Sequence, residues 1–204
     1  TSFVPETEEK VELTKFEITN TSDKAQTITS TVAIPMYARS ASNIRDHRHV
    51  TSLLHRTFTV KNGIMIYPTL TFDERGHNKN KIFYGALAKE EVNGEMVSPV
   101  SFCPVTEEFI GRGGNFENPY YVVKNQPLPY KAGEEVDGYE TVAAIRFADC
   151  TLEPGETRTY IVALGYGESE AEITELSKKY LIKKHFDKYL EETKEFWQEK
   201  INVS

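Results

Sequence analysis

The spacing of apolar residues changes once along this chain, close to Ser169, and the change restricts the folds open to it. Before that point, residues 27–34 alternate between apolar and polar side chains, and turn residues separate this run from other strand-like runs such as residues 157–164. A period of two is typical of half-buried β-strands. After Ser169, apolar residues recur about every 3.6 positions, which is the period of an amphipathic helix. The pattern predicts an all-β sandwich followed by a C-terminal helical segment.

Turn residues divide the β part into strands. Residues 9–34 contain two alternating runs broken by the polar residues 20–23, which predicts a hairpin or the edge of a meander. Asn62-Gly63 lies between two more alternating runs and predicts a second hairpin. Residues 90–138 are rich in Gly and Pro, which predicts mostly loops. Further strands are predicted at residues 82–87, 139–148 and 157–164, with a turn at residues 153–156 between the last two.

The C-terminal part carries start signals for a helix. Ser169 and Glu172 have the spacing of a capping box, in which side chains satisfy free backbone N–H groups. One helical face then carries Ile173, Leu176 and Tyr180. A second apolar series follows after residue 185, which predicts a helix or a pair of helices. We expect Phe196 and Trp197, which belong to that series, to pack in the core rather than to form a sugar platform.

The charge balance and the cysteines exclude several classes of protein. The chain has 31 acidic and 24 basic residues and a net charge of −7, whereas a nucleic-acid binder needs a basic face. No apolar run approaches the roughly 20 residues of a membrane span, so we expect no membrane partner. Cys103 and Cys150 show neither CxxC nor metal-ligand spacing. We therefore expect two buried or half-buried thiols and a reducing, cytoplasmic location.

The strongest local anomaly is a cationic stretch at residues 38–57, which holds four arginines and three of the five histidines. It allows three interpretations. Two histidines at i, i+2 on one face of a strand are compatible with a metal site, although zinc needs three or four ligands. Arginine forks suit sugar hydroxyls and phosphate oxygens. The stretch also fits a solvated edge strand, or charges that pair with the acidic excess of the domain. As candidate substrate-binding residues we name Arg45, His47, Arg48, His49, His55 and Arg56.

Two further loops carry candidate residues. The first contains Asp73 and Arg75 and suits sugar binding or an exposed turn. Its neighbouring acids are poor candidates for glycoside chemistry, because adjacent side chains diverge in an extended chain. The second loop, at residues 111–116, presents Arg112 and Asn115, either as a ligand contact or as a structural turn. It lacks the spacing of a phosphate-binding loop, and we expect Pro119 to prevent a following helix.

Three segments in order resemble the N-terminal region of glycoside hydrolase family 94, once called glycosyltransferase family 36. They are residues 3–5 with 16–23, residues 109–119, and residues 152–157 followed by 164–167. The family includes cellobiose, chitobiose and cellodextrin phosphorylases, and the cationic stretch is closer to its β-1,2-oligoglucan branch. The resemblance implies an antiparallel β-supersandwich like that of galactose mutarotase. In the family this sandwich is followed by a helical linker and an (α/α)6 catalytic barrel.

The resemblance also implies a division of labour. Residues 1–168 correspond to the sandwich and residues 169–204 to the linker. The general-acid Asp and the phosphate site of these inverting phosphorylases lie mainly in the barrel. We therefore expect no catalytic residue, metal or cofactor here, and inorganic phosphate only in the full-length enzyme. The implied partners are a β-glucan oligosaccharide, the barrel of the same parent chain and a second copy of the chain in a homodimer.

Two expectations remain beside this one. Thr1 is not a Met and no signal peptide is visible, so the chain reads as the middle of a longer protein whose sandwich is incomplete on its N-terminal side. The other hypothesis is a free-standing carbohydrate-binding sandwich. It would bind sugar through exposed aromatic residues such as Phe116, Tyr120 and Tyr121.

Overall fold

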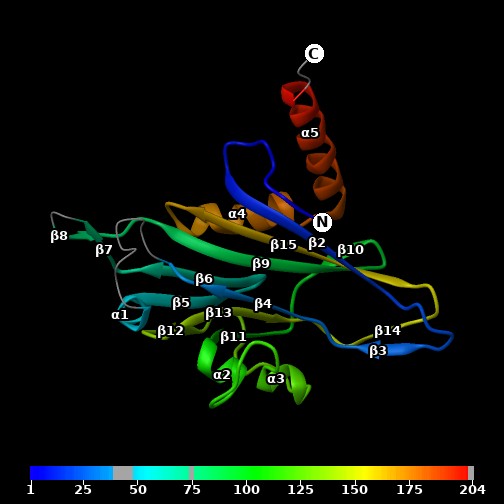
Figure 1. The fold of residues 1–204 in the computed structure, drawn as a ribbon, viewed down its shortest axis with the longest axis horizontal. Helices are drawn as coiled ribbons and strands as arrows, with labels where there is room; N and C mark the ends of the chain where they lie inside the picture. The colour runs from blue at the N-terminus through cyan, green and yellow to red at the C-terminus, as the bar shows by residue number, and fades with distance from the viewer. Residues whose placement is uncertain (39–47, 74–75, 202–204) are drawn as a thin grey trace.

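Two antiparallel sheets face each other, and two helices lie against the outer face of the larger one (Figure 1). The computed structural model describes residues 1–38, 48–73 and 76–201. In this part of the chain the larger sheet has eight strands. In spatial order they are β1 (Ser2–Phe3), β2 (Lys10–Thr19), β15 (Thr157–Gly167), β9 (Phe83–Val92), β6 (Gly63–Pro68), β5 (His55–Val60) and β12 (Glu135–Asp137), with β10 (Glu95–Val97) paired to β9.

The smaller sheet and two ribbons complete the β structure. The smaller sheet is β11 (Ser101–Val105), β13 (Thr141–Arg146) and β4 (Thr31–Met36). One ribbon pairs β3 (Gln26–Ile28) with β14 (Cys150–Leu152), and the other pairs β7 (Leu70–Asp73) with β8 (Gly76–Lys79). The predicted mainly antiparallel β architecture is confirmed.

Alternation along the strands builds two layers of core. In β15, Tyr160 and Val162 point towards the smaller sheet, where they pack with Ile145 and Phe147. The intervening residues Ile161 and Ala163 point the other way, into a second cluster shared with the helices. Strand β15 is therefore buried on both faces, which explains why its apolar residues are consecutive rather than alternating.

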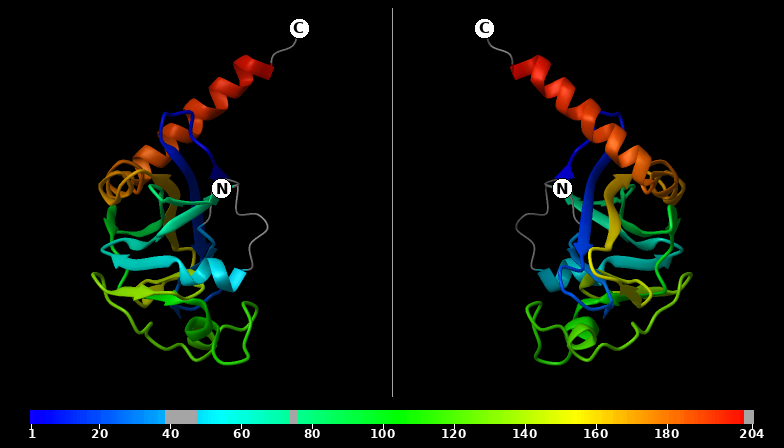
Figure 2. Two further views of the ribbon diagram at one scale, coloured as in Figure 1. Left: turned by 90° about the vertical axis from the view of Figure 1, so that its left-hand side faces the viewer. Right: turned by 90° about the vertical axis from the view of Figure 1, so that its right-hand side faces the viewer.

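The predicted helix pair is confirmed as α4 (Glu170–Tyr180) and α5 (Lys183–Ile201). The Ser169 Oγ accepts a hydrogen bond from the Glu172 backbone N–H at 3.2 Å, as the capping box requires. Of the described side chains in α5, Phe186 and Thr193 are buried. The far end of α5 extends away from the sandwich (Figure 2). The expectation that Trp197 packs in the core is wrong, because its position on this end leaves it 52% exposed.

Strand pairing differs from the sequence-based expectation at residues 9–34. The two strands do not form a hairpin, because β2 pairs with β1 and β15 whereas β3 pairs with β14 and β4 with β13. The Asn20 side chain directs the chain away from β2. Its Nδ2 donates to the carbonyls of Lys24 at 2.8 Å and Leu152 at 2.7 Å. The predicted hairpin at residues 55–68 is confirmed, with Val60 opposite Gly63.

Residues 90–138 contain more regular structure than their Gly and Pro content predicts. Besides β10, β11 and β12, they form the short helices α2 (Thr106–Ile110) and α3 (Tyr120–Val123). The expectation that no helix follows the loop at residues 111–116 is wrong. Pro119 has an extended backbone and stands directly before α3, a place where its missing N–H has no helical bond to lose. Between β9 and β10, Asn93 and Gly94 both have positive φ values and form a tight hairpin turn.

Both cysteines are free thiols, with Cys103 buried and Cys150 half-buried, as expected. Among the helices that the structure describes, none combines the length and apolar composition needed to cross a membrane.

Candidate functional site

The cationic stretch is divided among different environments. Arg45 and His47 lie outside the described residues. Arg48 and His49 begin helix α1 (Arg48–Leu53), and their side chains also lie outside the description. The interpretation of this stretch as an edge strand is wrong for its end. Strand β5 follows α1 and pairs with both β6 and β12.

His55 and Arg56 point to opposite faces of β5, as neighbours in a strand must. His55 is fully buried. Its Nε2 lies 3.1 Å from the Ala38 carbonyl oxygen, so this nitrogen carries the proton and donates. Burial lowers the pKa of the His55 ring, which keeps the ring neutral. The His55 side chain therefore contacts backbone inside the fold.

Arg56 points outwards and is half-buried. Its Nη1 donates to the His55 carbonyl at 2.9 Å, and its Nε lies 3.4 Å from Asp137 Oδ2. These contacts fix the guanidinium on the outer face of the larger sheet. The loop that contains Asp73 and Arg75 is only partly described. Asp73 is the last residue of strand β7, but its side chain is not described, and Arg75 lies outside the described residues.

A pocket of about 430 Å3 surrounds Arg112. We call it the tyrosine pocket. The chain reaches it through two glycines: Gly111 has a φ of 81°, and a Cβ on Gly114 would lie 2.1 Å from the Ile110 carbonyl oxygen. Only glycine allows this tight return from α2. The pocket is lined by Val105, Glu107, Glu108, Gly111, Arg112, Tyr120, Tyr121 and Tyr139.

The side chains of the tyrosine pocket suit a polyhydroxylated ligand. The rings of Tyr120 and Tyr121 meet edge to face, with centroids 5.4 Å apart. Tyr120 and Tyr139 are 45% and 54% exposed, which leaves ring surface for stacking. The Arg112 guanidinium supplies hydrogen-bond donors and the glutamates supply acceptors. Aromatic faces beside such groups are a usual composition for a small-ligand pocket.

Two protonated groups close to the pocket, Tyr130 and Cys103, offer no nucleophile. The Tyr130 hydroxyl donates to Glu108 Oε1 at 3.3 Å. Burial and this carboxylate raise the pKa of Tyr130, so the hydroxyl stays protonated. Burial raises the pKa of the Cys103 thiol to about 12, so it is not a thiolate at neutral pH. Sequence reasoning missed Glu107 and Glu108, although they are exposed acidic residues in the first turn of α2.

Asn115 and Phe116 shape the loop beside this pocket. The Asn115 Oδ1 accepts hydrogen bonds from the backbone N–H groups of Glu117 at 3.0 Å and Asn118 at 3.1 Å. This is an Asx turn. The Phe116 ring packs on Phe109, with centroids 6.4 Å apart. Of the predicted residues in this loop, Arg112 is the one that lines the pocket.

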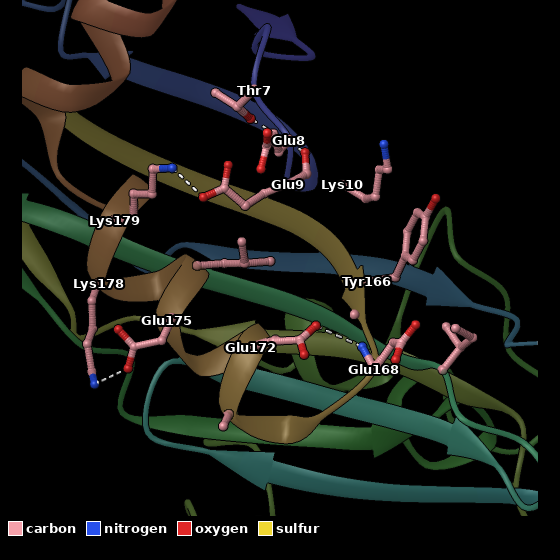
Figure 3. Close-up of a pocket in the computed structure, with 14 residues that line it drawn as sticks. Thr7, Glu8, Glu9, Lys10, Tyr166, Glu168, Glu172, Glu175, Lys178 and Lys179 are labelled. Carbon is pink, nitrogen blue, oxygen red and sulfur yellow. Dashed lines mark hydrogen bonds and ion pairs between the residues drawn. The ribbon is translucent and has the colours of Figure 1, made fainter.

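A larger hollow lies elsewhere, between the N-terminal loop, the end of β15 and α4 (Figure 3). Its volume is about 1160 Å3, and none of the predicted site residues lines it. Glu9 forms an ion pair with Lys179 on α4. The Tyr180 hydroxyl lies 3.0 Å from both Glu9 Oε2 and Thr7 Oγ1. We interpret these contacts as a structural connection between the N-terminal loop and α4.

This connection predicts a pH dependence of stability. The hydrogen bond from Lys179 lowers the pKa of Glu9 from 4.5 to about 2. Because the pKa of Glu9 is lower in the folded protein, its carboxylate stabilises the fold at pH values above 4.5, the pKa in the unfolded chain. This stabilisation is lost as the pH falls towards 2, the pKa in the folded protein. Glu9→Gln should therefore lower the free energy of unfolding by about 0.5 kcal/mol at pH 7. Urea titrations at pH 7 and pH 2 check this, and an equal difference at both pH values would contradict it.

Within residues 1–38, 48–73 and 76–201, no three His, Cys, Asp or Glu side chains come together as metal ligands would. A comparison with protein families matches residues 1–182 to the family described as glycosyl hydrolase 94, supersandwich domain. The match spans every strand described above and ends between α4 and α5. It confirms the resemblance read from the sequence. A search of curated proteins found no match.

Proposed function

Because this chain belongs to the glycosyl hydrolase 94 supersandwich family, we propose that it is the non-catalytic sandwich of a phosphorylase that acts on β-glucans. The family match over residues 1–182 is the observation that carries the proposal. It implies a structural domain associated with a phosphorylase. The finer role is to form one wall of the sugar-binding cleft and to contribute dimer contacts.

The tyrosine pocket supports a role as cleft wall. It places Arg112 and two exposed tyrosines on one surface. Tyrosine rings can stack on a sugar, and arginine can donate hydrogen bonds to its hydroxyl groups. Its two glutamates are consecutive on α2, so their side chains point about 100° apart around the helix. Inverting hydrolysis needs two carboxyl groups facing each other across the scissile bond. In inverting phosphorolysis bound phosphate takes the place of the carboxylate base, and the two glutamates beside Arg112 disfavour phosphate by like-charge repulsion. The pocket therefore suits binding, and catalysis falls to another domain.

That other domain is an (α/α)6 barrel of the parent chain, which would also hold inorganic phosphate. The exposed end of α5 supports a contact with it. This end carries Trp197 and Ile201, which are 52% and 68% exposed. Burying such apolar surface against a second domain is favourable. The free thiols of Cys103 and Cys150 support a cytoplasmic location.

The first test is turnover by the isolated chain. Incubated with inorganic phosphate and cellobiose, laminaribiose or sophorose, the chain should release no glucose 1-phosphate, because the proposal places the general acid and the phosphate site in the barrel. Release is followed by a coupled dehydrogenase assay, with an active phosphorylase as the positive control. Phosphorolysis that grows in proportion to chain concentration would overturn the proposal.

A free-standing carbohydrate-binding module is the second candidate function. The exposed faces of Tyr120 and Tyr139 favour it, since they are open in the isolated chain. Phe116 also keeps exposed ring surface, since it is 41% exposed although it contacts Phe109. If the chain is a free-standing module, its affinity for sugar must depend on Tyr120.

A further inference from the structure

A row of side chains crosses four adjacent strands on the outer face of the larger sheet. On β12 and β5, Asp137 stands opposite Arg56. On β5 and β6, Arg56 stands opposite Tyr67. The Tyr67 ring contacts Phe83 on β9. Cross-strand neighbours on one face lie close enough for their side chains to act together.

The row contains an aromatic platform. The centroids of Tyr67 and Phe83 are 4.8 Å apart, and the ring planes differ by 35°. Phe58 meets Tyr67 edge to face at 6.5 Å. All three residues are half-buried, and Phe58 and Phe83 pack against the core cluster that the same face shares with the helices. This packing holds the rings from one side, so a ligand that stacks on them would lose little side-chain entropy.

Polar groups border this platform around a cavity of about 450 Å3. We call it the sheet pocket. Among the described residues that line it, Arg56 is basic and Glu135, Asp137 and Glu170 are acidic. The acidic excess disfavours phosphorylated or carboxylated ligands by like-charge repulsion. The sheet pocket shares no lining residue with the tyrosine pocket.

We propose that the sheet pocket is a second carbohydrate site, which binds a neutral β-linked glucan chain. This inference rests on the proposed function for its class of ligand. A β-linked glucose ring carries its substituents equatorially and presents flat C–H faces, which match the Tyr67 and Phe83 rings. The carboxylates accept hydrogen bonds from hydroxyl groups, and Arg56 donates to them. The sheet pocket would hold glucan on the sandwich without taking part in phosphorolysis.

Calorimetry on the whole chain tests the site with cellotetraose, laminaritetraose and sophorotetraose, and with α-linked maltotetraose as the control sugar. At least one β-linked probe should bind more tightly than maltotetraose. Tyr67→Ala should weaken that binding about tenfold, and Tyr67→Phe should retain it because the ring face remains. Trp197→Ala removes an exposed aromatic outside both pockets and should leave affinity unchanged. Thermal unfolding verifies that each variant is folded, and Asp137→Asn with Glu135→Gln replaces Tyr67→Ala if that variant does not fold.

Several results would contradict the proposal that the sheet pocket binds glucan. They are no binding of any β-linked probe, equal binding of maltotetraose, and unchanged affinity in Tyr67→Ala. Loss of binding in Arg112→Ala or Tyr120→Ala alone would move the site to the tyrosine pocket and favour the free-standing module. Tighter binding of choline than of any sugar would identify a cation pocket instead. Phosphorolysis by the chain would overturn the proposed function and leave this binding result standing, so the two failures are distinguishable.

Discussion

Replacing Phe186 with Ala should lower the free energy of unfolding by about 3–5 kcal/mol, the usual loss for a buried phenylalanine. Phe186 lies near the start of α5 and is fully buried. Its ring meets Phe3 edge to face at 5.2 Å, and the Lys15 Nζ lies 5.3 Å from its centroid. The residue thus joins the helix to β1 and β2 at the edge of the larger sheet. Urea denaturation followed by circular dichroism measures the change.

Trp197→Ala is the matched control, because it removes a larger ring from the exposed end of the same helix. Its 52% exposure predicts a change within about 0.5 kcal/mol. If Phe186→Ala lowered the free energy of unfolding as little as Trp197→Ala does, α5 would not be anchored at its start. The expected contrast would show that the first turns of α5 belong to the fold of the sandwich, although the family match ends at residue 182.

Gly63→Ala should destabilise the protein by about 3 kcal/mol, because it places a methyl group in the middle of the larger sheet. The added Cβ would lie 2.0 Å from the Ala86 carbonyl oxygen and 2.8 Å from the Leu87 Cα. Both atoms belong to the backbone of β9, so no side-chain rotation relieves the clash. Strand β6 has β5 on its other side and cannot simply move away.

Gly113→Ala separates this clash from a general effect of replacing glycine. Gly113 has a φ of 71°, and nothing lies within 4 Å of its added Cβ. The expected loss is therefore only the conformational cost of a left-handed alanine, about 1 kcal/mol. Differential scanning calorimetry of both variants gives the comparison. A Gly63→Ala protein as stable as Gly113→Ala would contradict the close approach of β6 and β9.

The candidate site shows how far sequence reasoning reached. Arg112 was predicted as a possible contact and lies in the tyrosine pocket, because the glycines around it identify a tight, exposed loop. Glu107 and Tyr139 were not predicted, since they are distant in sequence and meet only when α2 packs beside the start of β13. Arg56 was chosen for its place in a cationic stretch, but its partners Asp137 and Tyr67 come from neighbouring strands.

The sequence alone determined the local elements of this protein. Alternation predicted the strands, Asn62-Gly63 a hairpin, and Ser169 with Glu172 the start of α4, because these signals act over a few residues. Only the tertiary structure decided that β2 pairs with β15, that His55 is buried and that Trp197 is exposed. A periodic pattern states that a face is apolar, but it does not state which surface covers that face. The choice is made by long-range packing of two sheets and two helices, which no local pattern encodes.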